Sequence, residues 1–150
     1  IIKLLKYIHC NNSKKKVLVF SNHESIIENI ITRVNNHDLS YKYEHAKGVG
    51  AEKSITRFKT GNSNLLFLNS KHNASGIEIV EGTDIIILHK MTNSVEKQII
   101  GRCMRMGRIQ PINVYYLYHM DEIEPQPQPQ PQLYIPPVAV PPNLPQLPLL

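Results

Sequence analysis

The segment from Gln98 to Arg108, which reads QIIGRCMRMGR, carries the side chains best suited to chemistry. At about 100° per residue of α-helix, Gln98, Arg102 and Arg105 fall within an arc of roughly 60°. Two guanidinium groups on one side of a helix repel each other unless they share an anion, and their planar forks match phosphate oxygens. In phosphoryl transfer such arginines offset the charge that develops in the transition state. The stripe therefore predicts a nucleotide-phosphate site. The alternatives are a solvated basic face and a face that only binds backbone phosphates.

A second polar segment, from Asn69 to Glu78, lies between two apolar runs. Asn69, Ser70 and Lys71 place an amide, a hydroxyl and an ammonium group at the end of the first run, followed by small residues as far as Gly76. A loop of this kind can offer donors to a phosphate. An ordinary polar connection that uses Gly76 as a turn residue is the alternative.

The surrounding pattern predicts the elements that position these groups. Apolar, β-rich runs predict strands at Val17–Phe20, Tyr41–His45, Leu65–Leu68, Asp84–His89 and Ile112–Tyr118. Helical spacing predicts a helix through Ile26–Val34 capped by Ser21 or Asn22, one at Ala51–Thr60 ended by Gly61, and one from Ser94 to about Met106. Alternating strands and helices indicate an α/β fold with a doubly wound, mostly parallel sheet, whose ligands meet the carboxyl ends of the strands.

These segments resemble the motifs of one family. QxxGRxxRxGR resembles motif VI of superfamily-2 helicases, residues 69–78 resemble motif V, and Val17–Asn22 resembles motif IV. The strand and acidic edge after motif VI resemble those of Swi/Snf-related motors. The resemblance covers about residues 16–124 and is to the C-terminal RecA-like lobe; the arrangement is similar to that in members from large DNA viruses.

The resemblance implies roles for individual residues. Arg102 and Arg105 would reach the γ-phosphate of ATP, held with Mg²⁺ by an N-terminal lobe, and Arg105 would be the arginine finger. Gln98 would couple the nucleotide and nucleic-acid sites. Gly76 and Glu78 would lie beside the ATP, Glu78 near its ribose. The remaining candidates would contact the backbone of the nucleic acid, for which DNA is favoured over RNA: Ser21, Asn22, Lys47, Asn69, Ser70 and Lys71.

Three features depart from a complete Swi/Snf motor. Arg108 stands where these enzymes usually carry Gln, and Asn73-Ala74 replaces the Gly-Gly pair of motif V. The sequence holds no Walker A lysine and no DExx-type motif, because Asp84 precedes its predicted strand instead of following it, and the Gly48–Ser54 stretch lacks the glycine that a phosphate loop needs directly before its lysine. We therefore expect this chain alone to be inactive.

Composition divides the chain into three parts. Residues 1–15 are expected to be a leading segment or helix from a preceding region, 16–124 the lobe, and 125–150 a disordered Pro/Gln-rich tail. The net charge of +5 lies wholly before residue 125 and favours polyanion partners. The tail predicts a polyproline spacer, or a ligand for an aromatic-grooved domain.

Two cysteines without CxxC spacing exclude a zinc ribbon and suit a reducing compartment, so we expect an intracellular protein of the nucleus, the cytoplasm or a viral replication site. No run of about 18 apolar residues occurs, and no membrane partner is expected. The sequence thus favours one lobe of an ATP-driven helicase or translocase. A degenerate lobe that only binds nucleic acid or protein is the alternative, and a Rossmann-type enzyme lacks its glycine fingerprint.

Overall fold

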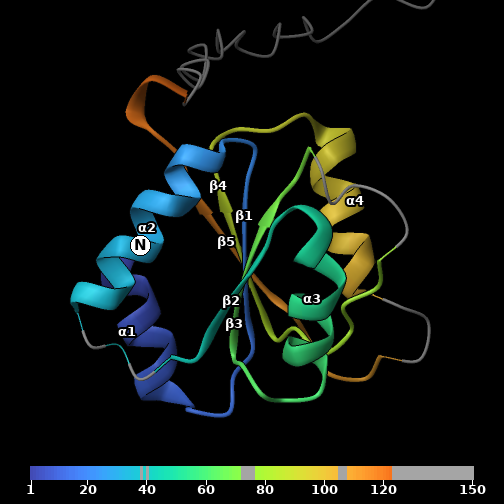
Figure 1. The fold of residues 1–150 in the computed structure, drawn as a ribbon. Coiled ribbons are helices and arrows are strands. Elements are labelled where there is room, and N and C mark those ends of the chain that lie inside the picture. The colour runs from blue at the N-terminus through green and yellow to red at the C-terminus, as the bar shows by residue number, and fades with distance from the viewer. Residues whose placement is uncertain (38, 40, 72–76, 105–107, 123–150) are drawn as a thin grey trace, which may run out of the picture.

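A computed structural model gives the structure of residues 1–37, 39, 41–71, 77–104 and 108–122. Five parallel strands form one sheet in the order β2-β3-β1-β4-β5 (Figure 1). The strands are β1 (Val17–Ser21), β2 (Tyr43–Ala46), β3 (Leu65–Asn69), β4 (Asp84–Leu88) and β5 (Asn113–Leu117). The crossover between β3 and β4, which places β1 in the middle, is the doubly wound arrangement that the sequence predicts.

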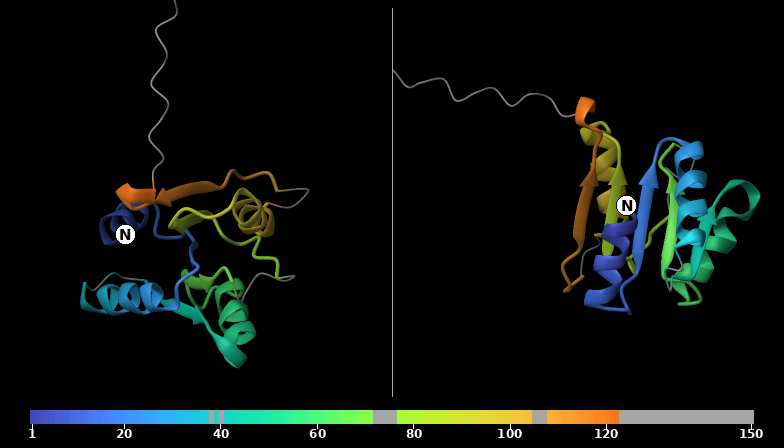
Figure 2. Two further views of the ribbon diagram at one scale, coloured as in Figure 1. Left: turned by 90° about the horizontal axis from the view of Figure 1, so that it is seen from above. Right: turned by 90° about the vertical axis from the view of Figure 1, so that its left-hand side faces the viewer.

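Helices cover both faces of the sheet (Figure 2). The helices α1 (Ile2–Asn11) and α2 (Glu24–Asn36) pack on one face, and α3 (Ala51–Lys59) and α4 (Asn93–Cys103) pack on the other. Leu5 and Ile8 of α1 are fully buried in the core, so this helix is packed as closely as the others. None of the helices in the described ranges is long and apolar enough to cross a lipid bilayer.

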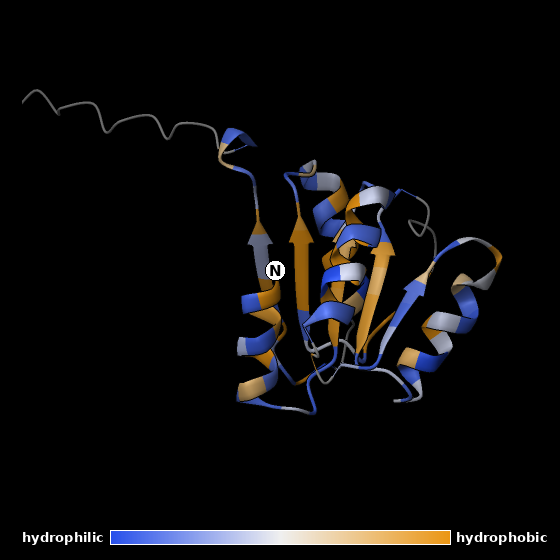
Figure 3. Ribbon diagram, turned by 60° about the vertical axis from the view of Figure 1, so that its left-hand side comes forward, coloured by the Kyte–Doolittle hydropathy of each residue, from blue (hydrophilic) through white to orange (hydrophobic). Residues whose placement is uncertain are grey.

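The three inner strands are buried at every position, which explains their continuous apolar runs. Along β1, Leu18 and Phe20 join the cluster under α3 and α4, whereas Val17 and Val19 join the cluster under α1 and α2. The outer strands β2 and β5 are only partly buried and carry more polar side chains (Figure 3). Each fully buried aliphatic or aromatic side chain contributes about 1.5–3 kcal/mol, so the inner strands carry most of the fold's stability.

Several element boundaries differ from the sequence prediction. The second strand begins at Tyr43, not Tyr41, because the buried Tyr41 side chain instead donates a hydrogen bond to the Leu5 carbonyl (2.9 Å). The prediction that Ser21 or Asn22 caps α2 is wrong: the cap residue is His23, and no side chain caps the helix.

The helix that carries Gln98 and Arg102 ends at Cys103 instead of about Met106. Met104 is already extended, and the Cys103 carbonyl accepts a hydrogen bond from Arg108 (3.1 Å) in place of the next helical N–H. By contrast, Gly61 has a φ of +86° just after α3, as expected of a residue that ends a helix.

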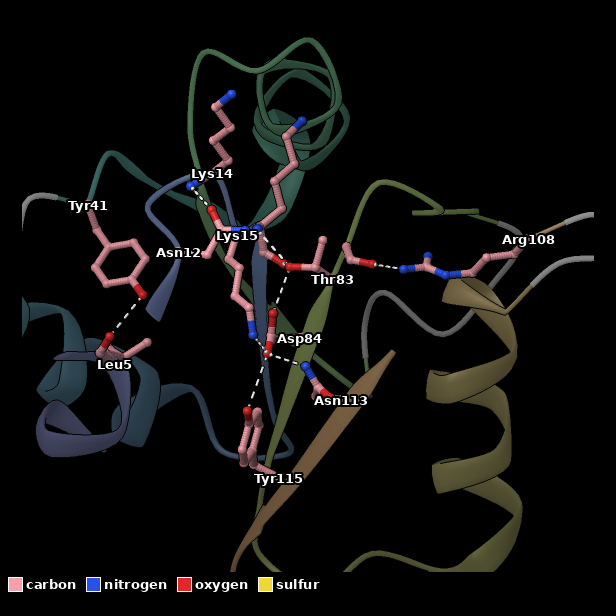
Figure 4. Close-up of polar contacts among 12 residues, drawn as sticks. Leu5, Asn12, Lys14, Lys15, Tyr41, Thr83, Asp84, Arg108, Asn113 and Tyr115 are labelled. Atoms are coloured by element: carbon pink, nitrogen blue, oxygen red, sulfur yellow. Dashed lines mark hydrogen bonds and ion pairs between the residues drawn. The ribbon is translucent and has the colours of Figure 1, made fainter. Parts of the chain in front are cut away.

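A buried carboxylate, Asp84, joins three strands at the amino edge of the sheet (Figure 4). It is the first residue of β4, so it lies at the start of the strand and does not follow it, as the sequence indicates. Its Oδ1 accepts from Lys15 Nζ (3.0 Å) and Asn113 Nδ2 (3.0 Å), and its Oδ2 accepts from the Thr83 hydroxyl (2.7 Å). The carboxylate thus ties the residues before β1 to the beginnings of β4 and β5.

We expect Asp84→Asn to lower the free energy of unfolding by about 2 kcal/mol, because it leaves the Lys15 ammonium unpaired beside a buried site. The measurement is urea unfolding of the chain followed by circular dichroism. Asp121→Asn is the matched control, since the Asp121 side chain is 88% exposed and its loss should cost less than about 0.5 kcal/mol. Equal effects of the two substitutions would contradict the structural role of Asp84.

Candidate nucleotide and nucleic-acid interface

The carboxyl edge of the sheet brings together the ends of β1 and β3. Ser21 pairs with Asn69 in the parallel register, and the Ser70 amide donates to the Ser21 carbonyl (2.9 Å). The segments that resemble motifs IV and V, some fifty residues apart in sequence, are therefore adjacent in space. The predicted backbone-binding residues before position 72 thus cluster at one edge of the sheet.

Glu24, in the first turn of α2, is the polar centre of this edge. Its Oε2 accepts from Asn69 Nδ2 (3.0 Å), and its Oε1 lies 2.8 Å from His45 Nε2 and 3.5 Å from Lys47 Nζ. Burial alone would raise the pKa of Glu24, but the hydrogen bond from Asn69 and the charges of His45 and Lys47 together lower it. Glu24 was not among the residues predicted from the sequence. Its one sequence signal is that it is an acidic residue in the first turn of a helix.

Two of the predicted binding residues have their side chains turned into the fold. The Ser21 hydroxyl, fully buried, accepts from the His23 amide (3.0 Å) and donates to the His23 carbonyl (3.2 Å). The Asn69 carboxamide bridges Glu24 and the amide of Lys71 (3.0 Å). Both residues therefore shape the loop ends and present little surface to a ligand.

Other predicted residues lie nearer the surface. Lys71 is exposed and follows Ser70, which retains 9% of its surface. The Asn22 Oδ1 atom is buried and has no hydrogen-bond partner among the described residues. A carbonyl oxygen accepts, so this atom fits a hydroxyl or N–H donor, whereas a phosphate would need the Nδ2 side of the amide.

Lys47 is held at the rim of this edge by two carboxylates. Its Nζ lies 2.6 Å from Glu28 and 3.5 Å from Glu24, and the hydrogen bond to Glu28 raises its pKa despite a smaller opposing effect of burial. The side chain remains 54% exposed, and exposed ion pairs exchange partners readily. Lys47 can therefore offer a remaining N–H to an incoming anion in competition with these carboxylates.

The helix α4 divides into a buried and an exposed face. Ile99 and Cys103 are buried, whereas Gln98 and Gly101 are exposed. A Cβ atom added at Gly101 would meet nothing within 4 Å. The face of α4 that carries Gly101 is thus turned away from the core of this chain.

Arg102 follows directly on this face and is half-buried. Burial lowers the pKa of its guanidinium, which stays protonated at neutral pH. Its carbonyl accepts from the Ile79 amide (3.0 Å), a bond that ties α4 to the segment before β4. Arg105 and Gly76 lie outside the described residues, and Glu78 is exposed beside the buried Ile79.

Arg108 has a structural role that the sequence did not reveal. Its guanidinium donates to four main-chain carbonyls, those of Val80 (2.7 Å), Gly82 (2.7 Å), Gln110 (2.8 Å) and Cys103 (3.1 Å). These bonds fasten the end of α4 to the loop before β4. Arg108 is therefore engaged with the protein itself.

Comparison with known proteins identifies the lobe. A model of the helicase conserved C-terminal domain matches residues 1–107. The chain belongs to this family. It is 31% identical over 120 residues to the "Putative helicase" of Acanthamoeba polyphaga mimivirus, an alignment that covers 80% of this chain but only 14% of that protein. The chain therefore spans a small part of the length of its relative.

Solved structures show the same fold at low identity. They include the C-terminal part of the Fun30 ATPase domain (TM-score 0.66, 23% identity, 76% of this chain and 38% of that one). The Pyrococcus furiosus Hef helicase domain matches with a TM-score of 0.62 (18%, 79% and 25%). The Chaetomium thermophilum RNA helicase Prp28 bound to ADP matches with 0.64 (16%, 77% and 29%). The fold is the RecA-like fold of helicase C-terminal domains.

The two cysteines allow the docking of α4 to be measured. Burial raises the pKa of Cys103 to about 12, whereas Cys10 is exposed. Because the thiolate is the reactive form, we expect iodoacetamide at pH 8 to label Cys10 at least about 100-fold faster than Cys103 in the folded chain. Peptide mass spectrometry checks the rates, and both thiols should react alike in guanidinium chloride. Similar rates in the folded chain would show that α4 is not packed as described.

Proposed function

We propose that this chain is the C-terminal motor lobe of an ATP-dependent nucleic-acid helicase or translocase. The observation that carries the proposal is the exposed face of α4. On this face Gln98 is exposed, the space over Gly101 is open, and the half-buried Arg102 follows directly. A buried apolar face fixes this helix on the sheet, so its polar face is rigid. A rigid, basic, uncovered helix face suits contact with a nucleotide held by another part of the protein.

In this proposal Arg102 and Arg105 stabilise negative charge on the γ-phosphate of ATP. Each guanidinium would donate N–H groups to the γ-phosphate oxygens while water attacks the γ-phosphorus and its bond to the ADP oxygen breaks, and it would stay protonated throughout. Such contacts are worth about 10³ to 10⁵ in rate. Among the described residues, no cluster of His, Cys, Asp or Glu could hold a metal ion. ATP and Mg²⁺ would be bound mainly by the N-terminal lobe.

The carboxyl edge of β1 and β3 would grip the nucleic-acid backbone. Lys71 offers an exposed donor and follows the nearly buried Ser70, Asn22 precedes α2 in the chain, and Lys47 lies at the rim. Ser21 and Asn69 would act by holding the loop ends in place. These groups address phosphate and sugar, so little sequence specificity is expected. Because the motifs resemble those of Swi/Snf-related motors, DNA is proposed as the nucleic acid that the lobe binds.

The arginine roles can be tested in the complete motor protein. Arg102→Ala or Arg105→Ala should lower nucleic-acid-stimulated ATP turnover by about 10³-fold, because the transition-state charge loses its partner. Affinity for the nucleic acid should change by less than about 3-fold, as the backbone contacts remain. Steady-state ATPase assays and fluorescence-anisotropy titrations give the two quantities.

Two controls accompany this test. Arg33→Ala removes an exposed arginine of α2, which packs on the opposite face of the sheet from α4, and should leave turnover unchanged. The 150-residue chain alone should show no turnover, since its sequence lacks a Walker A lysine. Retained turnover in both arginine variants would favour a lobe that only binds nucleic acid or protein.

The open space over Gly101 gives a second test. Gly101→Ala should stabilise the isolated chain by about 0.5–1 kcal/mol, because alanine is the better helix residue and its Cβ meets no atom. In the complete motor the same methyl group should lower ATP turnover by about 10-fold or more, if the nucleotide and the other lobe approach this face closely. The matched control is Gly50→Ala, which also adds a methyl group in open space. Unchanged turnover in the Gly101 variant would argue against a close approach there.

A further inference from the structure

A basic pocket lies at the amino edge of the sheet, opposite the edge described above. The segments that lead into β1, β2 and β3 meet there around a hollow of about 290 Å³. Its wall includes Lys14 and Lys16 before β1, Lys42 before β2, and Asn62, Ser63 and Asn64 before β3. Nothing in the proposed motor role uses this pocket.

The charge of the pocket is uniformly positive. Lys14, Lys16 and Lys42 contribute three ammonium groups, and none of the residues that line it is acidic. Within the described part of the chain, none of the three makes an ion pair with a carboxylate. In Figure 4 the Lys14 side chain extends away from Asp84, the acidic group nearest to it in the view. Three unneutralised cations around one hollow favour an anion.

Lys16 fixes one wall of the pocket and offsets the negative charge at the end of α3, which would otherwise repel an anion. Its Nζ donates to the carbonyls of Phe58 (2.6 Å) and Lys59 (3.0 Å) and lies 5.2 Å from the centre of the Phe58 ring. These carbonyls belong to the last turn of α3, whose dipole directs its negative end toward the pocket. The ammonium group neutralises that end and keeps a third N–H for a ligand.

Ser63 supplies the observation that most clearly points to a ligand. The residue is 3% exposed, and its hydroxyl has no hydrogen-bond partner among the described residues. Its neighbours differ, since Asn62 donates to the Thr60 hydroxyl (3.2 Å) and Asn64 accepts from the Lys42 amide (2.9 Å). A buried hydroxyl without a partner is costly and rare, and where it lines a basic pocket a bound anion satisfies it.

We propose that this pocket binds a phosphate group through Lys14, Lys42 and Ser63, with Lys16 as a fixed support. The phosphate belongs either to a nucleic-acid backbone that runs past the amino edge of the lobe or to a small phosphate ester. Both present the same tetrahedral oxyanion, and ammonium and hydroxyl donors match it. The site needs neither ATP hydrolysis nor the N-terminal lobe.

The test uses the 150-residue chain and inorganic pyrophosphate at constant ionic strength. Amide resonances of residues 61–64 should shift and saturate in NMR titrations. Lys14→Gln with Lys42→Gln should weaken the affinity about 10-fold or more, and Ser63→Ala about 3-fold or more, because charged and neutral donors are lost respectively. The matched control is Lys3→Gln with Lys6→Gln, which removes the same charge from the exposed side of α1 and should change nothing.

A single-stranded oligonucleotide distinguishes the two sources of phosphate. If it displaces pyrophosphate and loses affinity in the Lys14 and Lys42 variant, the ligand is a nucleic-acid backbone. If it does neither while pyrophosphate still binds, the ligand is a small phosphate ester. Equal weakening by the two lysine pairs, or no response of residues 61–64 to pyrophosphate, would overturn the proposal and leave the motor assignment untouched.

Discussion

The parallel pairing of β1 with β3 is the constraint on which the rest of the lobe depends. Parallel strands end at the same edge, so the register that joins Ser21 to Asn69 brings two loops together that the chain separates by some fifty residues. Parallel pairing requires crossover connections between the strands, and the helices on the two faces of the sheet bury β1, β3 and β4 on both sides. The same topology that makes the core continuous therefore concentrates polar groups at the carboxyl edge. It also gathers the lysines of the amino edge.

Glu24 shows how such an edge tolerates a carboxylate beside groups proposed to meet phosphates. An unpaired anion there would repel the nucleic acid. Here the Glu24 carboxylate is surrounded by the Asn69 amide, His45 and Lys47, so its negative charge is largely balanced within the protein. It fixes the orientation of Asn69 and, through it, the amide of Lys71. A negatively charged residue thus serves to arrange positively charged ones.

Much of the architecture could be predicted from the sequence, because strands buried on both faces leave continuous apolar runs such as Val17–Phe20. The family was indicated by a resemblance, because residues 98–108 combine several residue types at the positions that motif VI carries. The ends of elements were harder to predict. The end of α4 depends on a hydrogen bond from Arg108, five residues beyond Cys103, and helical periodicity does not contain that contact. Likewise the role of Glu24 depends on partners that only the fold brings to it. Ser63 stands out only because its buried hydroxyl has no hydrogen-bond partner among the described residues.

The four carbonyls held by Arg108 join two stretches of chain into one mechanical unit. Residues 80–82 before β4 and the end of α4 cannot move independently while a single guanidinium group bridges them. Glutamine, which Swi/Snf-related motors usually carry at this position, has two amide donors and could not satisfy the same carbonyls. The loop at residues 80–82 and the arginine at position 108 therefore depend on each other. A helix transplanted here from such a motor would need its own preceding loop to come with it.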